Sequence, residues 1–121
     1  MRRMLVRSAL ALVLCAALSA PALAHAILVE SQPAIDGTTA SGHVEFRLRY
    51  NSRIDRRRSR LILTLPDQSQ TILKIRDDGT EDLLLTAAEL QPGHYSLRWQ
   101  VLAVDGHITR GDVPFTVEAA P

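Results

Sequence analysis

The chain has 121 residues, with 14 Lys and Arg side chains against 13 Asp and Glu, one Cys, two Met and four His. A chain of this length forms one domain around a single core and is too short for a two-domain enzyme. The near-neutral charge also argues against a general nucleic-acid-binding protein, which normally has a clear excess of basic residues.

The first 24 residues are organised like a secretory signal peptide. Three Arg side chains fall within the first seven residues, residues 9–18 are wholly apolar, and Ala22-Leu23-Ala24 is a small-x-small cleavage signal. The apolar run is about half as long as a membrane-spanning helix requires. We therefore expect cleavage after Ala24, export to the periplasm, and a mature domain of residues 25–121 that begins at His25.

Cleavage at this position changes the chemistry that the chain can offer. Both Met residues, the Cys and three Arg leave with residues 1–24, so the mature domain keeps 11 basic and 13 acidic side chains and all four His. Without sulfur it has no disulfide, no Cys-based zinc site and no thiol nucleophile. An amino-terminal His25 has two nitrogen donors for a metal, its α-amine and its ring Nδ1, and a metal displaces the amine proton readily at neutral pH.

The mature domain has the pattern of short strands separated by turns. Apolar and polar residues alternate, or form short apolar runs, over residues 44–50, 61–65, 71–75, 95–101 and 113–117. Turn signals fall between these runs, at residues 35–37, 66–67, 77–79, 91–93 and 105–106. The aromatic side chains fall at the apolar positions of these alternating runs: Phe46, Tyr50, Tyr95, Trp99 and Phe115. Six or seven strands without a long helix predict an all-β sandwich or barrel.

Three other features of the mature chain each lead to a specific prediction. Residues 86–90 form at most one helical turn before Pro92. Residues 53–60 hold five Arg around Asp55; we interpret them as a solvated loop, with docking to an acidic partner or to anionic lipid head groups as the alternative. Pro114 lies on the polar face of the last strand, which predicts an edge position or a bulge.

The strongest candidate for chemistry is Asp105-Gly106-His107. In extended backbone, residues i and i+2 project from the same face, and Gly106 between them permits a turn. With an amino-terminal His25, the set would contain three nitrogen donors and one carboxylate, which suits Cu(II), the divalent first-row metal with the highest general affinity. The alternative is an ordinary Asp-Gly hairpin turn followed by an exposed His. We interpret His43 and His94 as exposed residues without a metal role.

Three stretches in chain order resemble the CopC-like periplasmic copper-binding proteins. Residues 25–33, H-A-I-L-V-E-S-Q-P, resemble the family's mature start, H-A-x-L-x-x-S-x-P. Residues 90–99 resemble its L-x-P-G-x-Y-x-x-x-W stretch. Residues 105–115 resemble its D-G-H-x-x-x-G-x-x-x-F ending. Together these stretches span the whole mature domain.

The resemblance implies a small, immunoglobulin-like Greek-key β-sandwich of about seven strands that binds one Cu(II) ion per chain. Carried over by position, the metal ligands are His25, through its amine and ring, Asp105 and His107. The resemblance also implies that the mature amino terminus lies beside the 105–107 turn. The implied role is that of a non-enzymatic copper carrier or buffer in copper homeostasis and resistance, which hands copper to a CopD-like inner-membrane protein.

This sequence departs from the family pattern in two places. Some members build a second, Cu(I) site from a Met-rich loop, and a mature chain without Met cannot form a site of that kind. Many relatives have an F-S-E-like segment where this chain has Tyr50-Asn51-Ser52, so a carboxylate contribution from that segment is not expected. Two other functions stay open at this point: a copper-dependent oxidative enzyme with an amino-terminal His, and a metal-free β-sandwich adaptor that binds a partner through the Arg-rich segment.

Overall fold

The computed structural model describes residues 25–121, so the expected signal peptide and its cleavage at Ala24 lie outside the described residues. Over this range the chain forms eight strands and no helix. The strands are β1 (Leu28–Gln32), β2 (Gly37–Ala40), β3 (Gly42–Tyr50), β4 (Ile54–Thr64), β5 (Gln70–Leu73), β6 (Leu83–Leu90), β7 (Gly93–Ala103) and β8 (Ile108–Glu118). No helix long and apolar enough to cross a membrane occurs between residues 25 and 121.

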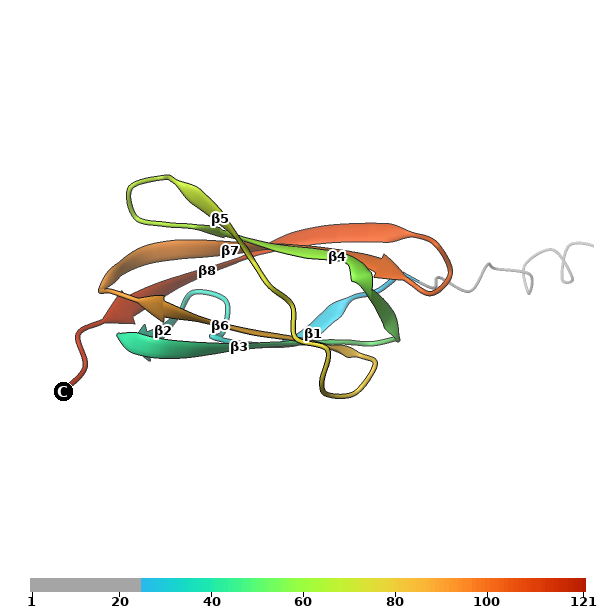
Figure 1. Ribbon diagram of the computed structural model, residues 1–121, viewed down its shortest axis with the longest axis horizontal. Helices are drawn as coiled ribbons and strands as arrows, with labels where there is room; N and C mark the ends of the chain where they lie inside the picture. Colours follow the sequence, from blue (N-terminus) through green and yellow to red (C-terminus); the bar gives the residue numbers. More distant parts are fainter. Residues whose placement is uncertain (1–24) are drawn as a thin grey trace, which may run out of the picture.

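The strands form two sheets that pack face to face (Figure 1). The smaller sheet has the order β1-β3-β6, and both of its strand pairs are antiparallel. The larger sheet has the order β2-β8-β7-β4-β5, in which β2 pairs with β8 in parallel and the other pairs are antiparallel. The chain changes sheets repeatedly, as a Greek-key sandwich requires, so the predicted fold class is confirmed.

Alternating side chains of the two inner faces form the core. All five aromatic side chains predicted for it are buried: Phe46, Tyr50, Tyr95, Trp99 and Phe115. They join the sheets by edge-to-face pairs, Phe46 with Phe115 at 5.6 Å and Tyr50 with Trp99 at 5.3 Å between ring centroids. Such pairs stabilise a core by roughly 0.5–1.5 kcal/mol beyond the area that they bury.

The prediction of a helical turn at residues 86–90 is wrong, because these residues belong to β6. They pair in antiparallel register with β3, where Phe46 lies opposite Thr86 and Gly42 opposite Leu90. The Ala and Glu residues in this stretch favour a helix locally, but pairing with β3 and burial of Leu84 and Leu90 against the core outweigh that preference.

The prediction of a solvated loop at residues 53–60 is also wrong, because β4 begins at Ile54. Between Asp55 and Arg60 this strand advances five residues, while its partner β7 advances two, from Leu102 to Gln100. The resulting bulge is held by the Ser59 hydroxyl, which donates to the Asp55 carbonyl at 2.6 Å and accepts from the Leu102 N–H at 3.3 Å. A bulge bends a strand without ending it, so charged residues can protrude while pairing resumes.

The Arg side chains of this bulge have different roles. Arg56 donates hydrogen bonds to the carbonyls of residues 77, 79, 80 and 83, and so closes the loop before β6. Arg57 and Arg58 are exposed. The prediction of an edge position or a bulge at Pro114 is wrong, because β8 lies between β2 and β7 and pairs with β7 without a register shift. Pro114 lies where the pairing of β8 with β2 begins, and its carbonyl accepts the Asp36 N–H at 2.7 Å.

The connections that matter for function meet at one end of the sandwich. The start of the described chain, the β3–β4 connection and the β7–β8 hairpin lie there, whereas the carboxyl terminus lies at the opposite end (Figure 1). The arrangement follows because β3 and β7 both run toward this end, where their last residues, Tyr50 and Ala103, lead into the two connections.

Candidate metal centre

The β7–β8 hairpin presents Asp105 and His107 on a tight turn. The Gly106 N–H donates to the Ala103 carbonyl at 2.9 Å, and the Ala103 N–H donates to the His107 carbonyl at 2.8 Å. Gly106 has a φ of 90°, which a residue with a side chain rarely adopts. The side chains of residues 105 and 107 are therefore not brought together by extended backbone, as one of the expectations had it. They are brought together by the turn that Gly106 permits.

Asp105 and His107 form a direct pair on this turn. The Asp105 carboxylate accepts the His107 backbone N–H at 3.1 Å, and its second oxygen lies 2.8 Å from His107 Nδ1. The hydrogen bonds from the ring and then from the backbone of His107 hold the pKa of Asp105 below its usual range. With Nδ1 directed at the carboxylate, the Nε2 atom of His107 is the nitrogen free to bind another group.

The backbone next to His25 is fixed to the same end of the sandwich. The Ile27 N–H donates to Asn51 Oδ1 at 2.8 Å, and the Asn51 N–H returns a bond to the Ile27 carbonyl at 3.0 Å. The Thr109 hydroxyl donates to the Ala26 carbonyl at 2.9 Å. Because the Ala26 side chain is also buried in the core, the chain is anchored from its second described residue onward.

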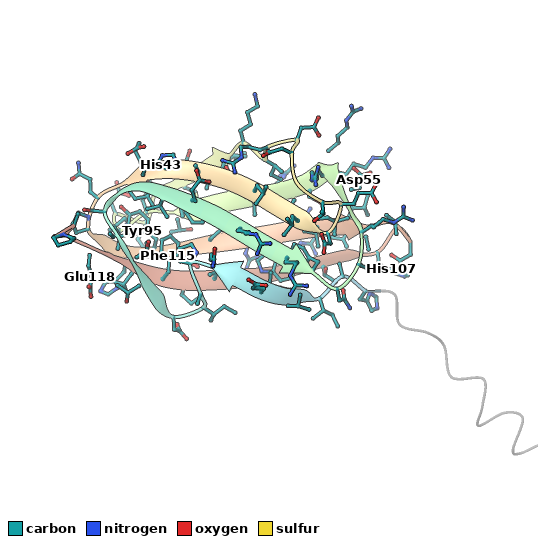
Figure 2. All side chains as sticks on the ribbon, turned by 90° about the horizontal axis from the view of Figure 1, so that it is seen from below. His43, Asp55, Tyr95, His107, Phe115 and Glu118 are labelled. Atoms are coloured by element: carbon teal, nitrogen blue, oxygen red, sulfur yellow. The ribbon has the colours of Figure 1, made fainter. Side chains whose placement is uncertain are left out.

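These anchors bring His25 beside His107. The two ring centroids are 4.8 Å apart with an interplanar angle of 71°. His107 exposes 62% of its side chain and its partner Asp105 exposes 24%, so the pair is open to solvent. Figure 2 shows His107 at the end of the sandwich where the described chain begins.

The three candidate side chains are neighbours, but they do not surround a common point. Among residues 25–121, no group of three or more His, Cys, Asp or Glu side chains is arranged to hold a metal ion. The Nδ1 atom of His107 faces Asp105, and the nitrogen of His25 belongs to the peptide bond with Ala24 in the full chain. The amine of His25 would therefore become a donor only after cleavage before this residue, and the side chains would have to rotate to converge on an ion.

The other two His residues lie at the opposite end of the sandwich (Figure 2 labels His43). Nδ1 and Nε2 of His43 lie 2.8 Å from the carboxylates of Glu89 and Glu45, respectively. His94 is the second residue of β7, roughly 30 Å of extended strand from Ala103, and it lies 3.2 Å from the Thr116 hydroxyl. Both are exposed, as predicted, and neither approaches the 105–107 turn.

The chain is thus a small all-β protein, a two-sheet Greek-key sandwich with two His residues and an Asp gathered at one end. Within that class the chain belongs to the CopC family, because residues 28–118 match the model of the CopC domain. The match includes Asp105 and His107 but starts three residues after His25, so it does not extend to the expected amino-terminal ligand.

Individual relatives agree with this assignment. Protein YobA of Escherichia coli K12 is 27% identical over 117 residues, which cover 93% of this chain and 94% of YobA. The crystal structure of CopC from Methylosinus trichosporium OB3b is similar with a TM-score of 0.69 and 27% identity, over 80% of this chain and 97% of that one. PcoC of E. coli, described as a methionine-rich copper resistance protein, shares the fold with a TM-score of 0.65 and 22% identity, over 78% and 100% of the two chains.

Sequence reasoning did not identify Asn51 and Thr109, which anchor the start of the domain. Asn51 directly follows an alternating strand, where an Asn normally indicates only a turn. Thr109 is one of several Thr residues in strands. Their hydrogen bonds to Ile27 and Ala26 join positions 24 and 83 residues apart, so no local pattern identifies them.

Proposed function

We propose that the mature protein binds one Cu(II) ion at the end of the sandwich that carries His25, Asp105 and His107. The observation that supports this most directly is the position of the His25 ring against His107, 4.8 Å between centroids. Residues 82 positions apart in the chain are thereby neighbours, and both present imidazole nitrogens at an exposed surface. Cleavage after Ala24 would add the α-amine of His25 as a further donor.

The donor set suits Cu(II) in its chemistry. Imidazole and amine nitrogens in a tetragonal arrangement favour this ion, and residues 25–121 contain no Met or Cys that would favour Cu(I). The rings of His25 and His107 already lie side by side, with centroids 4.8 Å apart, and their nitrogens would have to turn toward a common point to hold the ion. Asp105 can keep its hydrogen bond to His107 and still offer a free lone pair, because a carboxylate accepts about four bonds.

We assign the protein a role as a periplasmic copper carrier or buffer in copper homeostasis and resistance, without enzymatic activity. Membership of the CopC family and the similarity to PcoC, a copper resistance protein of E. coli, support the link to copper. His25, Asp105 and His107 would together supply four donor atoms to the ion, which would leave little room for a substrate. The exposure of His107 suits transfer of the ion to another protein, and a CopD-like inner-membrane protein is the partner that we propose.

The experiment that tests this function compares two forms of the protein. One form begins at an authentic His25, and the other carries one extra residue before it. Cu(II) is titrated into each and followed by quenching of Trp99, the single Trp of the chain, which lines a surface groove with Ala26 and Ile27. We expect tight one-to-one binding by the first form and a loss of at least about a hundredfold in affinity on extension, because the amine donor and its chelate ring disappear.

The other outcomes distinguish the alternative functions. Absence of Cu(II) binding by both forms would contradict the proposal and leave the metal-free adaptor. Equal binding by both forms would show that the amino terminus is not a ligand. Tight binding together with reductant-dependent oxidation of a glycan would indicate an oxidative copper enzyme instead of a carrier.

A further inference from the structure

The backbone beside the amino-terminal ligand is fixed at two consecutive residues. Ala26 is held through its carbonyl by the Thr109 hydroxyl at 2.9 Å, and the residue is 2% exposed. Ile27 is held through both of its backbone polar groups by Asn51, at 2.8 and 3.0 Å. His25 directly precedes these two anchored residues. The torsions of His25 itself and of its link to Ala26 are therefore the ones left to be set when it binds a ligand.

The two anchoring residues also connect His25 to the rest of the candidate site. Thr109 lies in β8, two residues after His107, so its bond to Ala26 joins the neighbour of His25 to the strand that begins directly after His107. Asn51 follows β3 and approaches from the smaller sheet. The segment that directly follows His25 is thus fixed to both sheets of the sandwich.

Fixing this segment in advance affects how tightly an ion can bind. Backbone that is disordered before binding has to be ordered by the ligand, and that entropic cost reduces the affinity. We propose, on the basis of the copper site inferred above, that Asn51 and Thr109 are positioning residues that preorganise the amino-terminal ligand of Cu(II). Neither side chain contacts the ion: each acts through the backbone of Ala26 or Ile27.

The test uses four variants of the protein with an authentic His25 start. Asn51→Ala removes the acceptor for Ile27, and Thr109→Val removes the donor to Ala26 while keeping the shape of the side chain. Thr109→Ser restores the hydroxyl. Thr71→Val is the matched control, because Thr71 is exposed on β5 of the larger sheet, away from residues 25–27.

We expect Asn51→Ala and Thr109→Val each to raise the Cu(II) dissociation constant by about tenfold. Thr109→Ser and Thr71→Val should change it by less than about twofold. The electron paramagnetic resonance spectrum of the two weakened variants should show a population with fewer bound nitrogens. Amide hydrogen exchange at Ile27 should be faster in Asn51→Ala without copper. A residue with only a structural role would lower the melting temperature and leave the metal affinity and spectrum unchanged.

The outcomes separate the positioning role from the proposed function. Tight Cu(II) binding by the unmodified protein, with unchanged affinity and spectrum in Asn51→Ala and Thr109→Val, would overturn the positioning role alone. Failure of the unmodified protein to bind Cu(II) would overturn the proposed function and the positioning role together. Failure of Thr109→Ser to restore affinity would show that the hydroxyl is not what anchors Ala26.

Discussion

At the scale of single residues, His107 and Asp105 act as a pair whose members have different exposure. The imidazole is largely open to solvent, while the carboxylate is more enclosed and accepts two hydrogen bonds from His107. This pairing resembles the way in which carboxylates orient metal-binding imidazoles, fixing the tautomer so that the outer nitrogen carries the free lone pair. Asp105 therefore has two possible contributions to one site, as a ligand and as the group that orients His107.

Substitutions at this pair should distinguish it from the remote His residues. We expect Asp105→Ala and His107→Ala each to lower Cu(II) affinity by about two orders of magnitude or more, because each removes a donor and leaves its partner unoriented. His94→Ala should leave the affinity unchanged, since His94 lies at the opposite end of β7. Competition titration against a Cu(II) chelator measures all three, and equal losses would show that the ligands are misassigned.

His43 illustrates a different use of an imidazole, in an exposed ion-pair network. Both of its ring nitrogens face carboxylates, which requires a doubly protonated ring. The hydrogen bonds to Glu45 and then Glu89 raise the pKa of His43. The bond from His43, followed by that from Arg76, lowers the pKa of Glu45. The network is therefore fully charged between the two shifted pKa values.

The stability of the fold should depend on pH through this network. A raised pKa in the folded state means that His43 stabilises the fold fully below its unfolded pKa of about 6.5, and that this contribution disappears as the pH rises through the folded pKa. We expect the difference in free energy of unfolding between the unmodified protein and His43→Gln to fall over that range. Urea denaturation at a series of pH values measures it. Parallel pH profiles for the two proteins would contradict the prediction.

At the scale of strands, the pair of Trp99 in β7 and Gly111 in β8 sets how closely the indole can lie on the neighbouring strand. A Cβ atom at position 111 would fall 2.4 Å from Cζ2 and 2.6 Å from Cε2 of the indole. The ring is buried and contacts Tyr50, so it has little freedom to move aside. A Gly at this position is what allows the indole of Trp99 to pack this closely against β8.

Gly111→Ala should therefore destabilise the fold by overpacking. We expect a loss of roughly 1–3 kcal/mol in the free energy of unfolding, measured by urea denaturation with far-UV circular dichroism. The matched experiment repeats the substitution in a Trp99→Phe background, where the atoms that clash are absent. The loss should be smaller there. An equal loss in both backgrounds would indicate that the backbone of Gly111, and not the indole, is responsible.

The strands also show what local patterns can and cannot predict. Strands β3, β7 and β8 were predicted because each buries alternate residues on one face. Strands β1 and β2 were missed because neither contains a fully buried residue, so their apolar and polar residues do not alternate clearly. The Arg-rich start of β4 was predicted to be a loop because its bulge interrupts the alternation and places charged side chains outward.

At the scale of the whole molecule, the candidate site combines local and distant contributions. The pairing of Asp105 with His107 was predictable, because it depends on three consecutive residues. The proximity of His25 was expected only from the family resemblance, since it depends on how both sheets pack. The anchoring by Asn51 and Thr109 could not be predicted, because each acts through a backbone group that any residue at position 27 or 26 would supply.

The carboxyl terminus lies at the end of the sandwich opposite the β7–β8 hairpin (Figure 1), and this placement has a practical consequence. A purification tag, a dye or a surface linker attached after Pro121 would leave the other end unobstructed. The same additions before His25 would block the position on which we propose that binding depends. The protein can therefore be immobilised on a sensor chip through its carboxyl terminus with its candidate site facing the solution, ready for a dissolved ion or a second protein.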